Sequence, residues 1–363
     1  MTLVQHRRIT RQIRVGNVDI GSNAQISVQS MTNTQTQDVD STVAQIHQLE
    51  KAGCQIIRVA VPDMEAALAI QQIKARIQIP LIADIHFDYR LALASAQAGA
   101  DALRINPGNI GSTRKIKAVV DCATDYGIPI RIGVNAGSLE KEIEQQFGPT
   151  AAGMVKSALK NIQMLEDLGF SKIKVSLKAS DVERTVSAYR KLAPLTDVPF
   201  HIGVTEAGGR IAGIAKSSIG IGLLLAEGIG DTLRVSLTRD PVEEVRTGYE
   251  ILRALGIRNR GPELISCPTC GRCRIDLFNI ADQVENALLE RSSEIKVAIM
   301  GCSVNGPGEA READIGIAGG DGKGILFKKG KVIRKIRQEE LVDQLLTEID
   351  MMIEHVEDGN GKE

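Results

Sequence analysis

The sequence predicts an α/β protein: a (β/α)8 TIM barrel in residues 1–258, followed by a smaller α+β domain in residues 259–363. Two observations lead to this prediction. Strand-like and helix-like segments alternate eight times between residues 26 and 255, and the alternation then stops before a cluster of cysteines. With 363 residues, the chain is also longer than a single core usually requires, which favours one large domain and one smaller domain.

The barrel prediction rests on the spacing of apolar residues. Eight short β-branched runs, each followed by a longer segment of helical period, are what a (β/α)8 barrel requires. An open doubly wound sheet would carry a glycine fingerprint after its first strand, where this chain has Gln29-Ser30-Met31-Thr32. The predicted strands are residues 26–31, 56–61, 81–85, 102–105, 130–134, 173–177, 200–204 and 232–237. The predicted helices include residues 38–52, 64–76, 113–126, 154–168 and 241–255.

Six of the predicted strands carry a cation or an imidazole at the same place, and the third strand adds Asp84 and His86. Because side chains alternate faces along a strand, these residues share one face, which we assign to the barrel lumen. An ordinary lumen is apolar, and burying several like charges is costly without compensation. The six residues are Arg58, Arg104, Arg131, Lys174, His201 and Arg234.

Two interpretations of this charged face are open. The cations either lie at hydrated strand ends and pair with Asp84 and Glu206, or they hold a multiply charged anion such as phosphate or diphosphate at the C-terminal mouth. The repetition over six strands favours the anion. The glycine-rich loop of residues 205–209 opens a helix at a place where such barrels often bind phosphate, although its glycines equally suit a tight turn.

The composition excludes several classes of partner. Lys and Arg total 44 against 45 Asp and Glu, so net charge favours neither nucleic acid nor an anionic membrane. The absence of tryptophan removes the usual stacking platform for single-stranded nucleic acid. No apolar stretch approaches membrane-spanning length, and residues 1–16 lack the apolar core of a signal peptide. We therefore expect a cytoplasmic protein with a local anion site.

The C-terminal domain follows residues 256–266, which break the barrel rhythm and are interpreted as a linker. Beyond the first cysteine loop, the pattern predicts a helix at 276–290, a strand at 296–300 and a second cysteine loop. It then predicts strands at 315–318, 324–327 and 332–336, and an amphipathic helix at 339–355. This order corresponds to a small α+β domain.

Four of the six cysteines lie in the two loops of this domain: Cys267, Cys270 and Cys273 in the first, and Cys302 in the second. Clustered cysteines in a cytoplasmic protein favour metal ligation over disulfides. A closed zinc site would have to use all four cysteines, because no histidine lies between Cys267 and His355. The first three match the opening of a bacterial ferredoxin motif, but no nearby cysteine completes it. A structural metal site therefore stays open as an alternative.

The cysteine loops and the segment Asn305-Gly306-Pro307-Gly308-Glu309 resemble the 4-hydroxy-3-methylbut-2-enyl diphosphate synthase family of the methylerythritol phosphate pathway. The resemblance extends through residues 28–32, 104–109, 131–135 and 205–208, and so covers nearly the whole chain. It implies reductive dehydration and ring opening of 2-C-methyl-D-erythritol 2,4-cyclodiphosphate to (E)-4-hydroxy-3-methylbut-2-enyl diphosphate. This is an oxidoreductase step in the biosynthesis of isoprenoid precursors, and it uses two electrons.

The resemblance also implies a [4Fe–4S] cluster bound by Cys267, Cys270 and Cys302, with Glu309 as an exchangeable fourth ligand. A carboxylate binds iron of such a cluster less firmly than a thiolate does, so it can yield its place to a substrate oxygen. Cys273 departs from the family pattern and leaves the fourth ligand open. We prefer Glu309, because four thiolates would close the cluster to substrate.

Further expectations concern the substrate pocket and the partners. We expect Glu206 to deliver a proton to the leaving oxygen, with Asp84 and His86 as helpers. The resemblance implies a homodimer and electron supply by a flavodoxin or ferredoxin. The alternatives are a TIM-barrel enzyme for a phosphorylated substrate with a purely structural metal site, and a non-catalytic electron-transfer or scaffold protein. By resemblance, the pocket residues are Arg58, Arg104, Asn106, Arg131, Asn135, Lys178, Thr205, Arg234 and Ser236.

Overall fold

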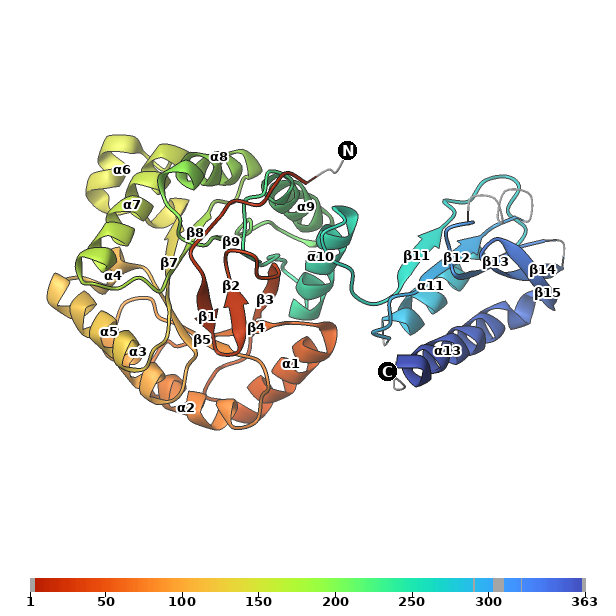
Figure 1. The fold of residues 1–363 in the computed structure, drawn as a ribbon, viewed down its shortest axis with the longest axis horizontal. Coiled ribbons are helices and arrows are strands. Elements are labelled where there is room, and N and C mark those ends of the chain that lie inside the picture. Colours follow the sequence, from red (N-terminus) through yellow and green to blue (C-terminus); the bar gives the residue numbers. More distant parts are fainter. Residues whose placement is uncertain (1–3, 290, 303–309, 321, 361–363) are drawn as a thin grey trace. The chain divides into compact units, whose positions relative to one another are not determined.

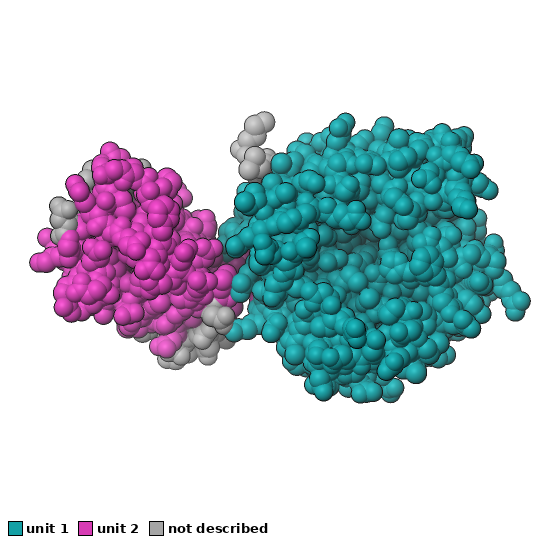
Figure 2. Space-filling model, turned by 180° about the vertical axis from the view of Figure 1, so that it is seen from behind, with its two compact units in different colours: residues 1–258 teal, residues 259–363 magenta. Residues whose placement is uncertain are grey.

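The computed structural model describes residues 4–289, 291–302, 310–320 and 322–360. The chain divides into two compact units, Met1–Arg258 and Asn259–Glu363, which Figure 2 shows in different colours. Each unit has its own hydrophobic core. The two units are therefore described separately.

The first unit is a parallel barrel of eight strands, surrounded by helices (Figure 1). The strands pair in the order β8-β7-β6-β5-β4-β3-β10-β9, and a bridge between Val175 and Phe200 joins β8 to the start of β9. The predicted (β/α)8 fold is confirmed. The strands are β3 Ser27–Met31, β4 Ile56–Ala60, β5 Leu81–Asp84, β6 Ala102–Ile105, β7 Ile130–Asn135, β8 Ile173–Lys178, β9 His201–Ile202 and β10 Thr232–Leu233.

The last two barrel strands are shorter than the sequence pattern predicts. Strand β9 ends where Gly203 adopts a φ of +156°, outside the range of regular strands. A Cβ atom at Gly203 would lie 2.3 Å from the carbonyl oxygen of Arg234, so the chain after β10 comes unusually close to this glycine. The regular strand pairing stops where Gly203 and Arg234 come together. The spacing of apolar residues in the sequence does not show where this contact occurs.

Aspartate is the N-cap residue of many of the barrel helices. The side chains of Asp38, Asp63, Asp88, Asp181 and Asp240 each accept a hydrogen bond from a backbone N–H of the first helical turn. Among the described residues, no helix combines the length and apolar character needed to cross a membrane. The helices of this unit are α1 Val39–Ala52, α2 Met64–Lys74, α3 Tyr89–Gln97, α4 Pro107–Ile110, α5 Thr113–Asp125, α6 Lys141–Phe147, α7 Ala151–Asp167, α8 Val182–Leu192, α9 Arg210–Ala226 and α10 Pro241–Ala254.

A hairpin closes the N-terminal end of the barrel. Its strands β1 (Ile13–Val15) and β2 (Val18–Ile20) pair around Gly16, whose φ is +56°, and lie across the middle of the barrel in Figure 1. The sequence analysis missed this hairpin, although Gly16-Asn17 between two alternating segments is a recognised turn signal. The plug is an apolar cluster of Ile13, Val15, Ile20, Ile56, Ile82 and Ala102.

The second unit contains a five-stranded sheet in the order β11-β12-β13-β14-β15. The first three strands are parallel and the last two pairings are antiparallel. Helices α11 and α13 share one hydrophobic cluster with the sheet. The elements are β11 Glu263–Ser266, α11 Leu277–Leu288, β12 Lys296–Met300, β13 Ile315–Ala318, β14 Lys323–Lys328, β15 Lys331–Arg337 and α13 Leu341–Asn360.

The interpretation of residues 256–266 as a linker is wrong for its last four residues. Glu263–Ser266 forms strand β11, which pairs in parallel with β12 at the edge of the sheet. Its side chains are half-buried or exposed, so the segment lacks the apolar alternation that marks a strand. Pairing with β12, which is distant in the sequence, determines its conformation.

Candidate functional site

The barrel lumen contains a cluster of buried cations. Arg58 on β4, Arg104 on β6 and Arg131 on β7 face the lumen together with Lys174 and Lys178 on β8, and none of the five is more than 9% exposed. The register supports their proximity, because Arg104 pairs with Arg131, and Arg131 with Lys174. These side chains lie further along the strands than the apolar plug, on the side of the C-terminal mouth.

Asp84 is the carboxylate at the centre of this cluster. Its Oδ1 accepts a hydrogen bond of 3.1 Å from Arg104 Nη1, and its Oδ2 lies 3.5 Å from Arg58 Nε. Although burial opposes the charge of Asp84, Arg58 and Arg104 lower its pKa to about 2. Asp84 is therefore ionised at neutral pH and orients two of the arginines.

Glu244 is a functional candidate that the sequence analysis missed. It lies in the first turn of α10, is 3% exposed, and its Oε2 is 3.1 Å from Nε of Arg234. One interpretation of the sequence pairs the cations with Glu206, but Glu206 is exposed, and the described ion pair of Arg234 is with Glu244. No motif marks Glu244, because its role depends on the packing of α10 against β3 and the segment after β10.

Several donors of the cluster have no hydrogen-bond partner among the described residues: Nε and Nη1 of Arg131, Nζ of Lys174 and Nε of Arg104. Burial, followed by neighbouring arginines, lowers the pKa of Lys174 to about 7 and that of Arg131 well below its usual value. Buried donors without partners are costly, and an excess of them in one cavity is typical of an anion site. The lumen is thus prepared for a negatively charged ligand.

Gly133 on β7 is required by the position of Arg104. A Cβ atom at this position would lie 2.5 Å from Arg104 Nε and 2.7 Å from its Nη2. Because Gly133 shares the lumen face with Arg131 and Asn135, the guanidinium of Arg104 occupies the space that a side chain would take. Glycine is therefore required at position 133 because any side chain there would collide with the guanidinium of Arg104.

The remaining predicted pocket residues lie where the strands end. Asn106 caps the short helix α4 by accepting a hydrogen bond from the backbone of Gly108, and Asn135, Thr205 and Ser236 are half-buried. His86 Nε2 lies 3.8 Å from Asp84 Oδ1. Glu206 has a φ of +51°, which is uncommon for a residue other than glycine, and is held there just before α9.

The cysteine loops lie at one edge of the second sheet. Cys267 follows β11 and Cys302 follows β12, and because these parallel strands are neighbours, their C-terminal ends meet at the same edge. The backbone N–H of Cys267 donates to Ile299, and that of Arg274 to Gly301. None of the six cysteines is in a disulfide. In the described part of the chain, no three His, Cys, Asp or Glu side chains are close enough to hold a metal, and Glu309 lies outside it.

Cys273, like Cys267, is half-buried against the hydrophobic cluster of the second unit. Its Sγ donates to the carbonyl oxygen of Ile275 at 3.3 Å and would be 2.7 Å from a Cβ atom placed on Gly301. Cys270 is exposed. Cys273 thus packs between the two loops, which favours a structural role for its thiol.

Comparisons with known proteins agree with this arrangement of two domains. The family model described as the GcpE TIM-barrel domain matches residues 10–249, and that of the GcpE protein C-terminal domain matches residues 263–351. The chain belongs to the GcpE family. As a GcpE protein, it has its charged lumen within the first matched region and all four clustered cysteines within the second.

Relatives of this GcpE chain are similar over nearly their whole length. The chain is 58% identical to the 4-hydroxy-3-methylbut-2-en-1-yl diphosphate synthase (flavodoxin) of Anoxybacillus flavithermus, covering 98% of both chains. It is 56% identical to the protein of that name from Bacillus subtilis, covering 97% of this chain and 93% of the relative. A dihydropteroate synthase from Stenotrophomonas maltophilia has a TM-score of 0.51 at 15% identity, over 68% of this chain and 98% of its own. That likeness concerns the fold alone.

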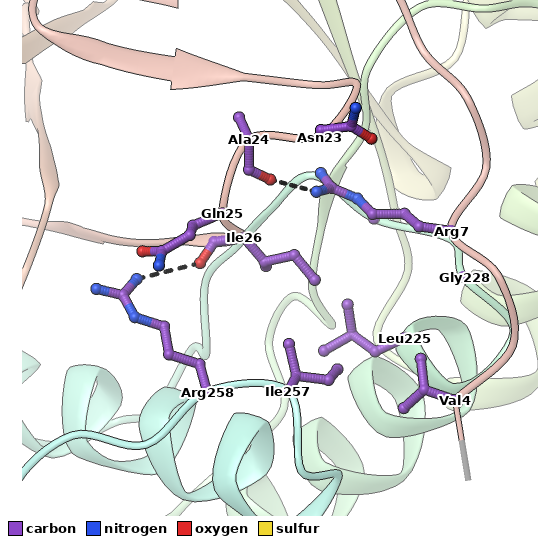
Figure 3. Close-up of a pocket in the computed structure, with 11 residues that line it drawn as sticks. Val4, Arg7, Asn23, Ala24, Gln25, Ile26, Leu225, Gly228, Ile257 and Arg258 are labelled. Carbon is purple, nitrogen blue, oxygen red and sulfur yellow. Dashed lines mark hydrogen bonds between the residues drawn. The ribbon is translucent and has the colours of Figure 1, made fainter. Parts of the chain in front are cut away.

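A separate cavity of about 290 Å³ lies at the other end of the GcpE barrel (Figure 3). Its lining includes Ala24, Ile26 and Gly230, which precede β3 and β10. Arg7 and Arg258 also line it, but Arg7 already bonds Ala24 and Asp231, and Arg258 bonds the Ile26 carbonyl oxygen and Gln55. Both guanidinium groups already bond neighbouring oxygens, although Nε of Arg7 is a buried donor without a described partner. This cavity therefore has fewer unpartnered donors than the lumen.

Proposed function

We propose that this GcpE protein converts 2-C-methyl-D-erythritol 2,4-cyclodiphosphate into (E)-4-hydroxy-3-methylbut-2-enyl diphosphate in the biosynthesis of isoprenoid precursors. The reaction consumes two electrons and two protons, opens the cyclic diphosphate and releases one water. The observation that carries the proposal is the excess of buried, incompletely bonded cations in the lumen. The similarity to synthases of that name supports the choice of substrate.

The lumen cations are proposed to bind the cyclic diphosphate. Arg131 and Lys178 supply buried donors, and Arg58 and Arg104 enter the same lumen from the neighbouring strands. Asp84 and Glu244 hold the arginines in place before the substrate arrives, which lowers the entropic cost of binding. At the mouth, we assign the polar contacts with the substrate to Asn106, Asn135, Thr205, Arg234 and Ser236.

The cysteine loops are proposed to bind a [4Fe–4S] cluster through Cys267, Cys270 and Cys302, with Glu309 as the fourth ligand. Thiolates are the usual ligands of iron–sulfur clusters. The two cysteine loops meet at one edge of the sheet, so their thiolates fit a [4Fe–4S] cluster. When bound, the cluster supplies the electrons of the reaction. The packing of Cys273 against Gly301 and Ile275 supports its exclusion from the ligands.

Glu206 is proposed to donate the proton to the departing oxygen. Its exposed carboxyl group lies at the mouth of the barrel, on the loop that precedes α9. Asp84 cannot fill this role at neutral pH, because the neighbouring arginines keep it ionised with a pKa of about 2. In the proposal, Asp84 orients Arg58 and Arg104, and His86 assists from 3.8 Å away.

The proposal extends to partners and location. The printed name of the relatives specifies flavodoxin, which supports a flavodoxin as electron donor. A ferredoxin, which carries an iron–sulfur cluster in place of a flavin, is the alternative donor in the proposal. A homodimer and a cytoplasmic location are part of the proposal and follow from the sequence analysis. A cross-linking or sedimentation measurement of the anaerobically purified protein tests the dimer.

The function is tested by anaerobic turnover of the cyclic diphosphate with an artificial reductant. We expect the wild-type protein to form the linear diphosphate, and Glu206→Gln and Glu309→Ala to lose most of that activity. Elemental analysis accompanies the assay. Zinc without sulfide in an inactive wild-type protein would instead support the barrel enzyme with a structural metal site.

A further inference from the structure

Two of the six strand residues that define the charged face, Lys174 and His201, have no role in the proposed function. His201 is completely buried on β9. Its Nε2 lies 3.3 Å from Nζ of Lys178, and its Nδ1 lies 2.7 Å from Oγ1 of Thr232 on β10. Three strands, β8, β9 and β10, therefore contribute one buried chain of hydrogen bonds.

The chemistry of Lys178 determines the protonation of His201. Burial, followed by Arg131 and Arg234, lowers the pKa of Lys178 well below its usual value. In the ammonium form that binds an anion, Lys178 can only donate, so Nε2 of His201 accepts from it and carries no proton. The neutral ring then holds its proton on Nδ1 and donates it to the Thr232 hydroxyl oxygen. A second proton on the ring would point an N–H group at an ammonium group.

The surroundings of His201 agree with a neutral ring. Burial first, and then the charge of Lys178 and Arg131, lowers the pKa of His201 well below its usual value. The basic groups whose charges act on the ring are Lys178 and Lys174 on β8, Arg131 on β7 and Arg58 on β4. From β10, the ring meets the uncharged Thr232.

Gly203 provides the space for this arrangement. A Cβ atom at this position would lie 3.0 Å from Nζ of Lys178, so the lysine side chain extends across β9 at the glycine. Gly203 directly follows β9, two residues after His201. The sequence His201-Ile202-Gly203 thus combines an acceptor with the clearance that Lys178 needs to reach it.

We propose that His201 is a positioning residue, which Thr232 holds as a neutral acceptor and which fixes the ammonium group of Lys178 for the diphosphate. This inference rests on the proposed function, in which Lys178 binds the substrate. A lysine side chain has several rotatable bonds, and its ordering before binding removes an entropic cost. His201 takes one of the three ammonium donors and leaves two for phosphate oxygens.

The first experiment measures binding of the cyclic diphosphate by calorimetry to the anaerobically purified, cluster-containing protein. Thr232→Val removes the acceptor for Nδ1 at constant volume, and we expect it to weaken binding about 10-fold, the effect of one lost hydrogen bond between neutral groups. Thr232→Ser keeps the hydroxyl and restores the affinity. His201→Met weakens binding similarly, and His201→Gln, whose amide oxygen can accept from Lys178, recovers part of the loss.

The outcomes separate this inference from the proposed function. A wild-type protein that does not bind the cyclic diphosphate would overturn the proposed function. Binding by wild type that Lys178→Met abolishes, while His201→Met and Thr232→Val leave it unchanged, would overturn the positioning role alone. In turnover assays, the positioning role predicts a raised KM with kcat largely retained, whereas general misfolding reduces both.

A second measurement needs no substrate. The chain has 5 histidines, so a ¹⁵N-histidine NMR spectrum of the full-length protein is simple, and His201→Gln identifies the resonance. We expect a neutral ring with its proton on Nδ1 that does not titrate between pH 6 and pH 8.5. A ring that titrates in this range, or that carries its proton on Nε2, would contradict the proposal.

Discussion

Arg104 and Gly133 fit together in neighbouring strands: the guanidinium of Arg104 lies where a side chain at position 133 would begin, 2.5 Å from its ideal Cβ atom. The fit keeps Arg104 within reach of Asp84. Because backbone atoms hold position 133 in place, even a methyl group there must displace the arginine.

Gly133→Ala should therefore weaken substrate binding more than it weakens the fold. We expect KM for the cyclic diphosphate to rise about 10-fold, since one charged hydrogen-bond partner is displaced. Gly137→Ala is the matched control, because nothing lies within 4 Å of a Cβ atom there. Equal KM values for the two variants would show that Arg104 adapts without cost.

Glu244→Gln should reduce substrate affinity by releasing Arg234. The carboxylate of Glu244 accepts from Arg234 and from the backbone N–H of Leu237. Glutamine keeps only one of these two oxygens and no charge, so the substitution weakens the hold on Arg234 and on the loop after β10. We expect a KM increase of about 10-fold and a loss of stability of about 2 kcal/mol, measured by urea unfolding. The adjacent Glu243→Gln, which removes an exposed pair with Arg210, should change neither quantity.

Lys174→Met should stabilise the protein in a pH-dependent way. The pKa of Lys174 is about 7 in the folded state, against 10.5 for an ordinary lysine. Its cost to stability is therefore complete below pH 7, decreases as pH rises towards 10.5, and is absent above that value. At pH 8, the substitution should raise the free energy of unfolding by about 3 kcal/mol. The exposed Lys160→Met serves as control, and a gain independent of pH would disprove this explanation.

The two neighbouring cysteines Cys270 and Cys273 should respond oppositely to replacement by serine. Cys273 packs against Gly301 and bonds Ile275, so Cys273→Ser should retain iron and sulfide and lose only some thermal stability. Cys270→Ser removes a proposed ligand and should lose iron. Elemental analysis and the visible absorption of anaerobically purified protein give both results. Iron loss in Cys273→Ser together with retention in Cys270→Ser would reverse the ligand assignment.

The barrel and its charged face could be predicted from the sequence, because both follow from the regular spacing of side chains along single strands and helices. Side chains alternate strictly along a strand, so a cation repeated at one strand position had to enter one lumen. The role of Glu244 could not be predicted, because it depends on how α10 packs beside β3. Strand β11 was not predicted for a similar reason. Its pairing with β12, and not its own residue pattern, makes it a strand.

The hairpin of β1 and β2 was not predicted for a different reason. Alternation in β1 and β2 is only three residues long on each side of Gly16, too short for a periodic signal, and the hairpin is held by contacts with Ile56 and Ile82 from strands that follow it. Among the cysteines, the sequence predicted the two loops, while their meeting at one sheet edge and the packing of Cys273 emerged only from the fold.

The apolar plug, to which Ile13, Val15 and Ile20 belong, restricts how ligands enter and leave the barrel. Because the N-terminal end of the barrel is filled, substrate and product must use the same opening at the C-terminal end. The linear diphosphate must leave before another cyclic molecule enters. Product and substrate therefore exclude each other from the lumen, and the linear diphosphate should displace the cyclic diphosphate in a binding measurement.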